Sequence, residues 1–243
     1  MDVDRIGRLD RVPRRAGALA AVAAAVLVLA AGCGGAAPER KVGIRGEDAQ
    51  LVEAADLARQ AMAVYRKGQF IQAEELFQKL KDRFPFTPYA SLAELRLADC
   101  RFYQGGRYEE AITQYEEFEK LHPANEAIPY VVFQIGTSYY RLMEAPDRDQ
   151  TATRKMIETY ERLLKRFPDS PYTLEARRRI AAGRERLAEH ELVVARWYLR
   201  VGKRAQARFR LEGILRDYPE TRTAATARRL MAGLVEAGDP GPS

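Results

Sequence analysis

Apolar residues between about residues 49 and 237 recur three and four positions apart, the spacing of one face of an α-helix. One stretch sets the pattern: residues 68–85 are GQFIQAEELFQKLKDRFP, with a Gly at the start and a Pro 17 residues later. The same frame returns at residues 106–123 and 202–219, and a fourth copy without the Gly ends at Pro168. A small or flexible residue stands five positions into each copy and a large apolar residue nine positions in. The repetition predicts helices that pack in pairs.

Each part of the frame has a physical reason. A Gly accepts the positive φ of a tight turn between antiparallel helices, a small residue lets two helices approach, and a Pro ends a helix because it has no N–H. Gly68 and Gly106 are 38 residues apart, near the 34-residue spacing of a known helix–turn–helix repeat. The frame resembles the tetratricopeptide repeat (TPR), which has Gly, an aromatic residue, Ala and Pro at these offsets. We therefore predict an all-α, TPR-like helical-hairpin solenoid of about four to five repeats and nine to ten helices.

The apolar pattern also predicts where the helices lie. They are expected at residues 49–67, 70–84, 89–104, 108–121, 125–143, from 151 to about 167, 172–201, 203–218 and 221–236. The segment 172–201 has no Pro and forms either one long helix or two that abut near residues 188–191; its length favours two. Residues 145–149 interrupt the third repeat, and this insertion is either part of a binding face or neutral drift. The N-terminal repeats then span residues 49–123, the C-terminal repeats 124–237, and a disordered tail 238–243.

The first 32 residues have a different pattern. Five Arg precede an apolar run at residues 18–31, which is short for a membrane span and ends in small residues. This arrangement predicts a signal peptide over residues 1–32. Leu29-Ala30-Ala31-Gly32-Cys33 resembles a bacterial lipobox, which implies lipidation of Cys33; the alternative is an ordinary secretory signal with an incidental Cys. Residues 33–48 are then expected to form a lipidated flexible tether, held at the membrane by acyl chains.

Composition fits a folded helical protein and narrows its chemistry. The 243 residues are 47% hydrophobic and 30% charged, and two Cys exclude a disulfide framework. The net charge of +6 is uneven, since residues from Thr173 onward contain 15 Lys and Arg against 9 Asp and Glu. Such an excess suits nucleic acid, anionic lipid or an acidic protein surface.

A peptide groove is suggested by aromatic and basic residues at repeated positions. In the TPR frame, one position of each first helix that faces the concave side holds Tyr65, Tyr103 and Tyr140 in successive repeats. Rings and phenols suit a peptide with aromatic side chains, and nearby arginines could meet a C-terminal carboxylate. The alternative is that these tyrosines only pack between helices. The predicted groove residues are Tyr65, Arg66, Arg96, Tyr103, Phe133, Tyr140 and Arg141.

No enzyme chemistry is indicated. His122 and His190 have no Cys or second His at ligand spacing, so no metal and no cofactor are expected. Cys100 is expected to be a half-buried structural thiol instead of a nucleophile. Trp197 and Tyr198 are expected to pack between helices. The sequence contains none of the common nucleotide-binding or hydrolase motifs.

Four segments carry a more specific resemblance: RFPFTPY at residues 83–89, DRD at 147–149, RFPDSPY at 166–172 and LEGILRDYPET at 211–221. With the lipobox, they resemble the BamD family of outer-membrane assembly lipoproteins. The resemblance implies a lipid-anchored protein on the periplasmic face of the outer membrane. Its N-terminal repeats would receive the aromatic C-terminal segments of unfolded outer-membrane proteins. Its C-terminal repeats would dock on the POTRA domains of the barrel subunit.

The resemblance also implies a docking residue. Arg210, in Arg210-Leu211-Glu212-Gly213, matches the arginine with which the family contacts the barrel subunit. Other lipoproteins are further candidate partners. By the resemblance, we expect the second helix of the family's last repeat, which would take part in such contacts, to be missing.

Two other functions stay open at this point. A TPR lipoprotein of another envelope machine, for pili, cell wall or division, would share the fold. A binder of anionic polymers would use the basic C-terminal half, but the basic residues there lack interleaved aromatic residues, so nucleic acid is not an expected partner.

Overall fold

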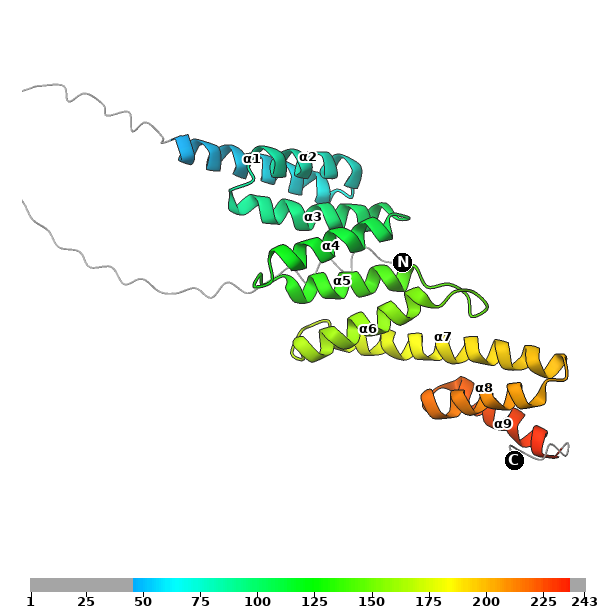
Figure 1. The fold of residues 1–243 in the computed structure, drawn as a ribbon. Coiled ribbons are helices and arrows are strands. Elements are labelled where there is room, and N and C mark those ends of the chain that lie inside the picture. Colours follow the sequence, from blue (N-terminus) through cyan, green and yellow to red (C-terminus); the bar gives the residue numbers. More distant parts are fainter. Residues whose placement is uncertain (1–45, 237–243) are drawn as a thin grey trace, which may run out of the picture. The chain divides into compact units, whose positions relative to one another are not determined.

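The computed structural model describes residues 46–236 of the chain. The predicted signal peptide, Cys33, most of the predicted tether and the C-terminal tail lie outside these residues. The described part forms nine α-helices and no strand (Figure 1). They are α1 (Gly46–Arg66), α2 (Phe70–Arg83), α3 (Pro88–Gln104), α4 (Tyr108–Leu121), α5 (Ile128–Arg141), α6 (Thr151–Arg166), α7 (Thr173–Arg200), α8 (Arg204–Asp217) and α9 (Arg222–Glu236).

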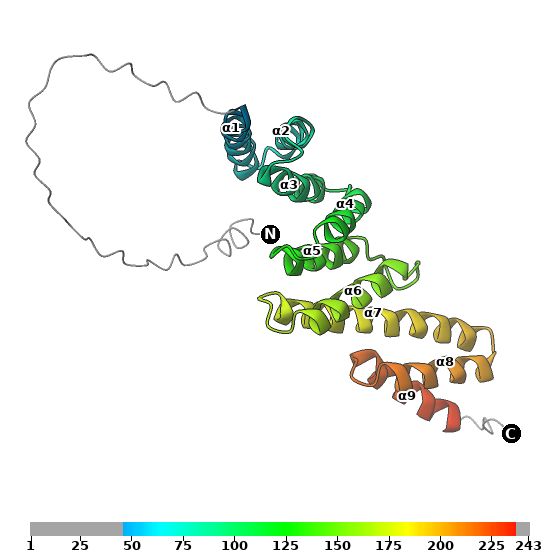
Figure 2. The ribbon, with the colours of Figure 1, turned by 60° about the vertical axis from the view of Figure 1, so that its left-hand side comes forward.

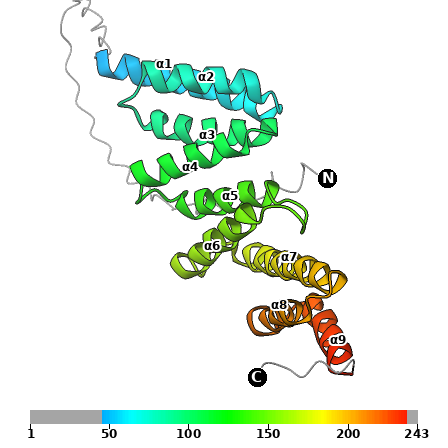
Figure 3. The same ribbon diagram turned by 45° about the vertical axis from the view of Figure 1, so that its right-hand side comes forward.

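Helices that are neighbours in sequence are neighbours in space. Each helix packs against the next along the chain, and in addition α1 contacts α3 and α7 contacts α9. Figures 2 and 3 show the resulting hairpins following one another in chain order, α1 with α2, α3 with α4, α5 with α6 and α7 with α8. The all-α, TPR-like prediction is confirmed, with four hairpins and a final helix in the described residues.

The Gly of the repeated frame makes the turn inside a hairpin. Gly68, Gly106 and Gly202 have φ of 75°, 72° and 73°, in the left-handed region that only Gly enters without strain. The apolar positions of the frame are buried as predicted. The residues five and nine positions into the copies have no exposed surface: Ala73, Phe77, Ala111, Tyr115, Met156, Tyr160, Ala207 and Leu211.

The Pro of the frame fixes where a helix ends. The residue before each Pro leaves the helical conformation, because the Pro ring crowds it out of the α region. All four such residues have φ between −137° and −127° and ψ between 47° and 62°: Phe84, His122, Phe167 and Tyr218. Each still donates its backbone N–H to the carbonyl four residues earlier. The four copies therefore end their helices in the same geometry.

The interior consists of three apolar clusters. The first lies among α1, α2 and α3, the second reaches from α3 to α7, and the third lies among α7, α8 and α9. The first two clusters contain residues of more than one hairpin, and the third joins the last hairpin to α9, as expected of a repeat protein that buries its apolar faces between neighbours.

The structure decides between the two alternatives for residues 172–201, against the one that length favoured. Residues 173–200 form a single 28-residue helix, α7, and not two abutting helices. Leu187, Ala188 and Leu192 are buried and continue one apolar face through the expected break, so no turn is needed there. Gly183 does not break α7 either; it allows a close approach, because a Cβ there would lie 2.5 Å from Met156 Cε.

Several helix boundaries differ from the prediction by a few residues. α1 begins at Gly46, earlier than expected. α5 begins at Ile128 and α7 at Thr173, and both starts are later than expected. Asn125 Oδ1 accepts a hydrogen bond from the backbone N–H of Ala127 (2.9 Å), and Ser170 Oγ accepts one from Tyr172 (3.3 Å). These side chains therefore support turns that precede the helices.

The insertion after α5 is fastened to α7. Gln150 is buried and its Nε2 donates to the carbonyls of Ala145 (2.9 Å) and Arg148 (3.1 Å). The His190 Nδ1 of α7 lies 2.7 Å from the carbonyl oxygen of Pro146. His190 thus has a role in holding the loop.

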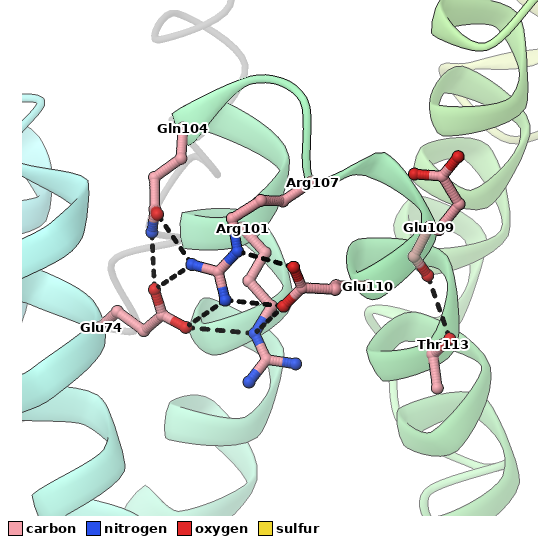
Figure 4. Close-up of polar contacts among 7 residues, drawn as sticks. All are labelled: Glu74, Arg101, Gln104, Arg107, Glu109, Glu110 and Thr113. Carbon is pink, nitrogen blue, oxygen red and sulfur yellow. Dashed lines mark hydrogen bonds and ion pairs between the residues drawn. The ribbon is translucent and has the colours of Figure 1, made fainter.

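A network of charged side chains joins the first two hairpins (Figure 4). The carboxylate of Glu74 on α2 accepts hydrogen bonds from Arg101 Nε (3.1 Å), Gln104 Nε2 (2.6 Å) and Arg107 Nη1 (2.8 Å). Arg107 also pairs with Glu110 on α4 (2.7 Å). Burial alone would raise the pKa of Glu74, but the hydrogen bonds from Arg107, Gln104 and Arg101 outweigh it and lower that pKa. The network holds α2, α3 and the start of α4 together.

Candidate functional site

Two arginine–tyrosine contacts lie between first helices of successive hairpins. In the first, which we call the N-terminal site, the guanidinium carbon of Arg96 on α3 lies 5.4 Å from the ring centroid of Tyr65 on α1. The Tyr65 ring meets Phe70 and Tyr103 edge-on at 5.5 Å and 6.3 Å, and Phe70 stacks on Tyr103 at 5.1 Å. Tyr65 and Tyr103 therefore belong to one aromatic cluster that also packs helices.

A buried acid anchors the N-terminal site. Asp99 on α3 is fully buried and accepts hydrogen bonds from Arg96 Nη1 (2.6 Å), Tyr115 Oη (2.5 Å) and Tyr130 Oη (2.8 Å). The Nε of Arg96 is buried and has no hydrogen-bond partner among the described residues. Sequence analysis missed Asp99. The signal was a lone acid in an otherwise apolar face of a helix, which requires a partner when it is buried.

The ionisation of the N-terminal site follows from burial and from Asp99. Burial would lower the pKa of Arg96, but the nearby Asp99 carboxylate more than compensates, so the pKa is raised. Burial first and Asp99 second raise the pKa of Tyr65 above its usual value. The same two causes raise the pKa of the Cys100 thiol to about 12. Arg96 is therefore a permanent cation, and Cys100 is a fully buried thiol, where half-burial was predicted.

The second contact, which we call the central site, lies around Arg179 on α7. Its guanidinium carbon is 5.1 Å from the ring centroid of Phe133, 5.0 Å from that of Tyr140 and 5.9 Å from that of Tyr160. Its Nη1 donates to Thr137 Oγ1 and to Tyr160 Oη, both at 2.8 Å.

An acid on its own helix completes the central site. Arg179 Nε donates to Glu175 Oε1 at 2.8 Å, and the Glu175 side chain is 42% exposed. Arg179 was not among the predicted site residues. The signal was present, because Arg179 follows RFPDSPY at the offset at which Arg96 follows RFPFTPY.

The other predicted groove residues are placed differently. Tyr140 is 38% exposed and Phe133 is half-buried, stacked on Tyr172 at 4.7 Å. Arg66 and Arg141 are exposed, and no hydrogen bond or ion pair of either is found in residues 46–236. The structure thus gathers Tyr65, Arg96 and Tyr103 in one site and Phe133 and Tyr140 in another.

The predicted docking residue lies beside a pocket at the other end of the described chain. Arg210 on α8 pairs with Glu191 on α7 at 2.9 Å. Arg210 also lines an open pocket of about 300 Å³ with Tyr198, Ala205, Gln206 and Phe209. Phe209 is 67% exposed. An exposed ring next to an arginine is a composition typical of protein interfaces.

Trp197 on α7 differs from its prediction. It meets Tyr198 edge-on at 5.0 Å, but it is 46% exposed. The prediction that Trp197 packs between helices is therefore wrong, and it adds a second exposed aromatic ring to the C-terminal hairpin.

Two further observations on the described residues concern metal and membrane sites. No group of three His, Cys, Asp or Glu side chains there is placed to hold a metal ion. No helix between residues 46 and 236 combines the length and apolar character needed to cross a bilayer. The Nε2 of His122, one of the two histidines considered as metal ligands, lies 2.6 Å from Oε2 of Glu94.

The stacked helical hairpins and their repeated frame place the described chain in the class of TPR-like repeat proteins. The family model YfiO, described as outer membrane lipoprotein, matches residues 51–237, and the chain belongs to this family, the YfiO/BamD family.

Curated relatives carry the name outer membrane protein assembly factor BamD. The one from Vibrio cholerae is 27% identical over 183 residues, 71% of this chain and 76% of the relative. The one from Caulobacter vibrioides is 26% identical over 200 residues, 82% of this chain and 64% of the relative. The one from Neisseria gonorrhoeae is 27% identical over 193 residues, 74% of this chain and 72% of the relative.

Proposed function

We propose that this protein is a non-catalytic, lipid-anchored scaffold and substrate receptor in the assembly of β-barrel proteins into the outer membrane. The family match over residues 51–237 carries the proposal, because it spans the N-terminal site, the central site and the Arg210 pocket together. The names of the relatives support a role in outer-membrane protein assembly. They also favour this function over one in pili, cell wall or division.

In this proposal the C-terminal hairpin docks on the POTRA domains of the barrel subunit. Arg210 and the exposed ring of Phe209 form the contact, and the basic excess after Thr173 favours an acidic partner surface. Glu191 holds Arg210 in place through their ion pair before the partner binds.

Co-purification from detergent-solubilised membranes tests this docking. We expect Arg210→Gln to weaken recovery of the barrel subunit by roughly tenfold or more, about 1.4 kcal/mol or above, because a partner carboxylate would lose its cation. The matched control is Arg216→Gln on the same helix, since Arg216 is exposed and its one ion pair within residues 46–236 is with its neighbour Asp217. Absence of the barrel subunit from the wild-type preparation would refute the proposed function.

The proposed anchor is an acylated Cys33, which places the protein on the periplasmic face of the outer membrane. Mass analysis of the mature protein is the direct test. We expect Cys33 as the new first residue with attached acyl chains; a mature chain that still contains residues 18–31 would contradict the anchor.

The proposed substrates are aromatic C-terminal segments of unfolded outer-membrane proteins. The aromatic cluster of Tyr65 and Tyr103, with the fixed cation of Arg96, is a surface suited to such a ligand. Binding of a synthetic peptide ending in Phe, measured by fluorescence anisotropy, tests the receptor role.

A further inference from the structure

We infer that Arg179, with Tyr140, forms a second binding site on this protein, one that takes the terminal carboxylate of a polypeptide ending in an aromatic residue. The inference rests on the proposed receptor function and deepens it, since it assigns the carboxylate to Arg179 and not to the predicted Arg141.

The internal repeat makes the central site equivalent to the N-terminal site. Arg96 lies 11 residues after Pro85, and Arg179 lies 11 residues after Pro168. Each guanidinium lies over the tyrosine of the preceding first helices at the same repeat position, 5.4 Å from the Tyr65 ring and 5.0 Å from the Tyr140 ring. The same arginine–tyrosine contact therefore occurs in two places in the repeat.

The two sites differ in the acid that accompanies the cation, because the side chains of Arg96 and Arg179 are equally exposed, at 20%. Arg96 is paired with Asp99, which is fully buried and fully used by two tyrosine hydroxyls as well. Arg179 is paired with Glu175, whose side chain is 42% exposed and also has Arg178 at 3.9 Å. Solvent screens an exposed acid, so Glu175 neutralises Arg179 less than the buried Asp99 neutralises Arg96, and the guanidinium of Arg179 can attract an incoming carboxylate.

The guanidinium of Arg179 is held in position before a ligand arrives. Its Nη1 is fixed by Thr137 and Tyr160 and its Nε by Glu175, and three rings surround it. No hydrogen bond from its Nη2 is found among the described residues. A donor that is already oriented costs little entropy on binding, so Nη2 is the group that would donate to a carboxylate oxygen.

The ring of Tyr140 is the surface on which the aromatic side chain of the ligand would pack. It is 38% exposed while its neighbour Arg179 is mostly covered. A ligand ring that packs on Tyr140 would bring a carboxylate on the same residue close to Arg179. This combination selects a C-terminal aromatic residue over an internal one, because only the former carries both groups.

The test measures the preference of the full mature protein in detergent for a free carboxylate. A labelled peptide ending in Phe is compared with the same peptide as a C-terminal amide, by fluorescence anisotropy. We expect the wild type to bind the free acid at least tenfold more tightly, and Arg179→Gln to reduce this ratio to about two or less. Arg178→Gln is the matched control: it removes the same charge from the adjacent, exposed position and is expected to keep the ratio.

The outcomes separate this inference from the receptor function. A wild type that binds neither peptide refutes the receptor function. A wild type that binds both peptides equally, or an Arg179→Gln variant that keeps the ratio, overturns the assignment of Arg179 alone. Loss of the ratio in Arg178→Gln as well would show general attraction instead of a site, and also overturns it.

A second variant keeps the inference testable if Arg179→Gln does not fold by circular dichroism. Tyr140→Ala changes an exposed ring, and it is expected to reduce the preference for a terminal Phe over a terminal Ala at least threefold. An unchanged Phe preference in Tyr140→Ala would overturn the inference.

Discussion

The N-terminal site and the central site share a repeat position, a tyrosine and an arginine, yet they differ in the acid that accompanies the arginine. Asp99 stands three residues after Arg96 and lies on the buried face of α3, whereas Glu175 stands four residues before Arg179 and is partly exposed. The first arrangement holds α3 to α4 through Tyr115 and joins that hairpin to the next one through Tyr130 on α5. The comparison shows that one repeat frame can place its arginine beside a buried acid in one hairpin and beside a partly exposed acid in another.

The largest expected effect is a difference in the free energy of unfolding between variants of the two acids, Asp99 and Glu175. Asp99→Ala leaves the Arg96 charge and two tyrosine hydroxyls without their acceptor, so we expect a loss of about 3–5 kcal/mol in the free energy of unfolding. Glu175→Ala is the matched variant at the central site, and its expected loss is below about 1 kcal/mol because solvent screens the pair. Urea unfolding of both variants measures the difference. Equal losses would show that the two acids have the same role.

The second largest expected effect on stability comes from Gly136, a glycine next to the central site. A Cβ at Gly136 would lie 2.6 Å from Cε1 of the Tyr160 ring, which is fully buried and cannot move aside easily. We expect Gly136→Ala to destabilise the protein by about 1–3 kcal/mol through overpacking. Gly213→Ala is the control, since nothing lies within 4 Å of its Cβ position; helix propensity alone would stabilise it by roughly 0.5–1 kcal/mol. A stabilised Gly136→Ala would mean that Tyr160 has room to shift.

The smallest effect concerns acid stability near the N-terminal site. Because the folded pKa of Glu74 is lowered, the network in Figure 4 contributes stability above the unfolded pKa and loses it as the pH falls through the folded pKa. We expect Glu74→Gln to cost about 1 kcal/mol at pH 7, after allowance for solvent screening, and to flatten the decline of stability below pH 5. Urea unfolding at pH 7 and at pH 4 measures both; a variant with the wild-type pH slope would exclude Glu74 as its source.

The features that the sequence predicts well are those with a local cause. The glycines at positive φ, the prolines that end helices and the buried Ala73 or Phe77 all follow from a repeated frame that acts within one hairpin. The continuity of α7 was not predictable in this way, because it depends on the burial of Leu187 and on the packing of Leu192 with α8 and α9. Length alone pointed to the wrong answer.

The candidate sites show the same division. Tyr65, Tyr103 and Tyr140 were found because they recur at one position, and Arg179 could have been found by its offset from Pro168. The role of Asp99 could not, because a carboxylate in a helix is usually solvated, and only tertiary packing brings Tyr115 and Tyr130 to it.

The unbroken α7 has a mechanical consequence. Arg179 and Glu191 stand 12 residues apart on this one helix, about 18 Å along its axis at the usual rise. Because α7 is one continuous helix, a tilt of its N-terminal half also tilts its C-terminal half. In the proposed function, a polypeptide bound at Arg179 would therefore act on the same helix whose Glu191 pairs with Arg210 of α8.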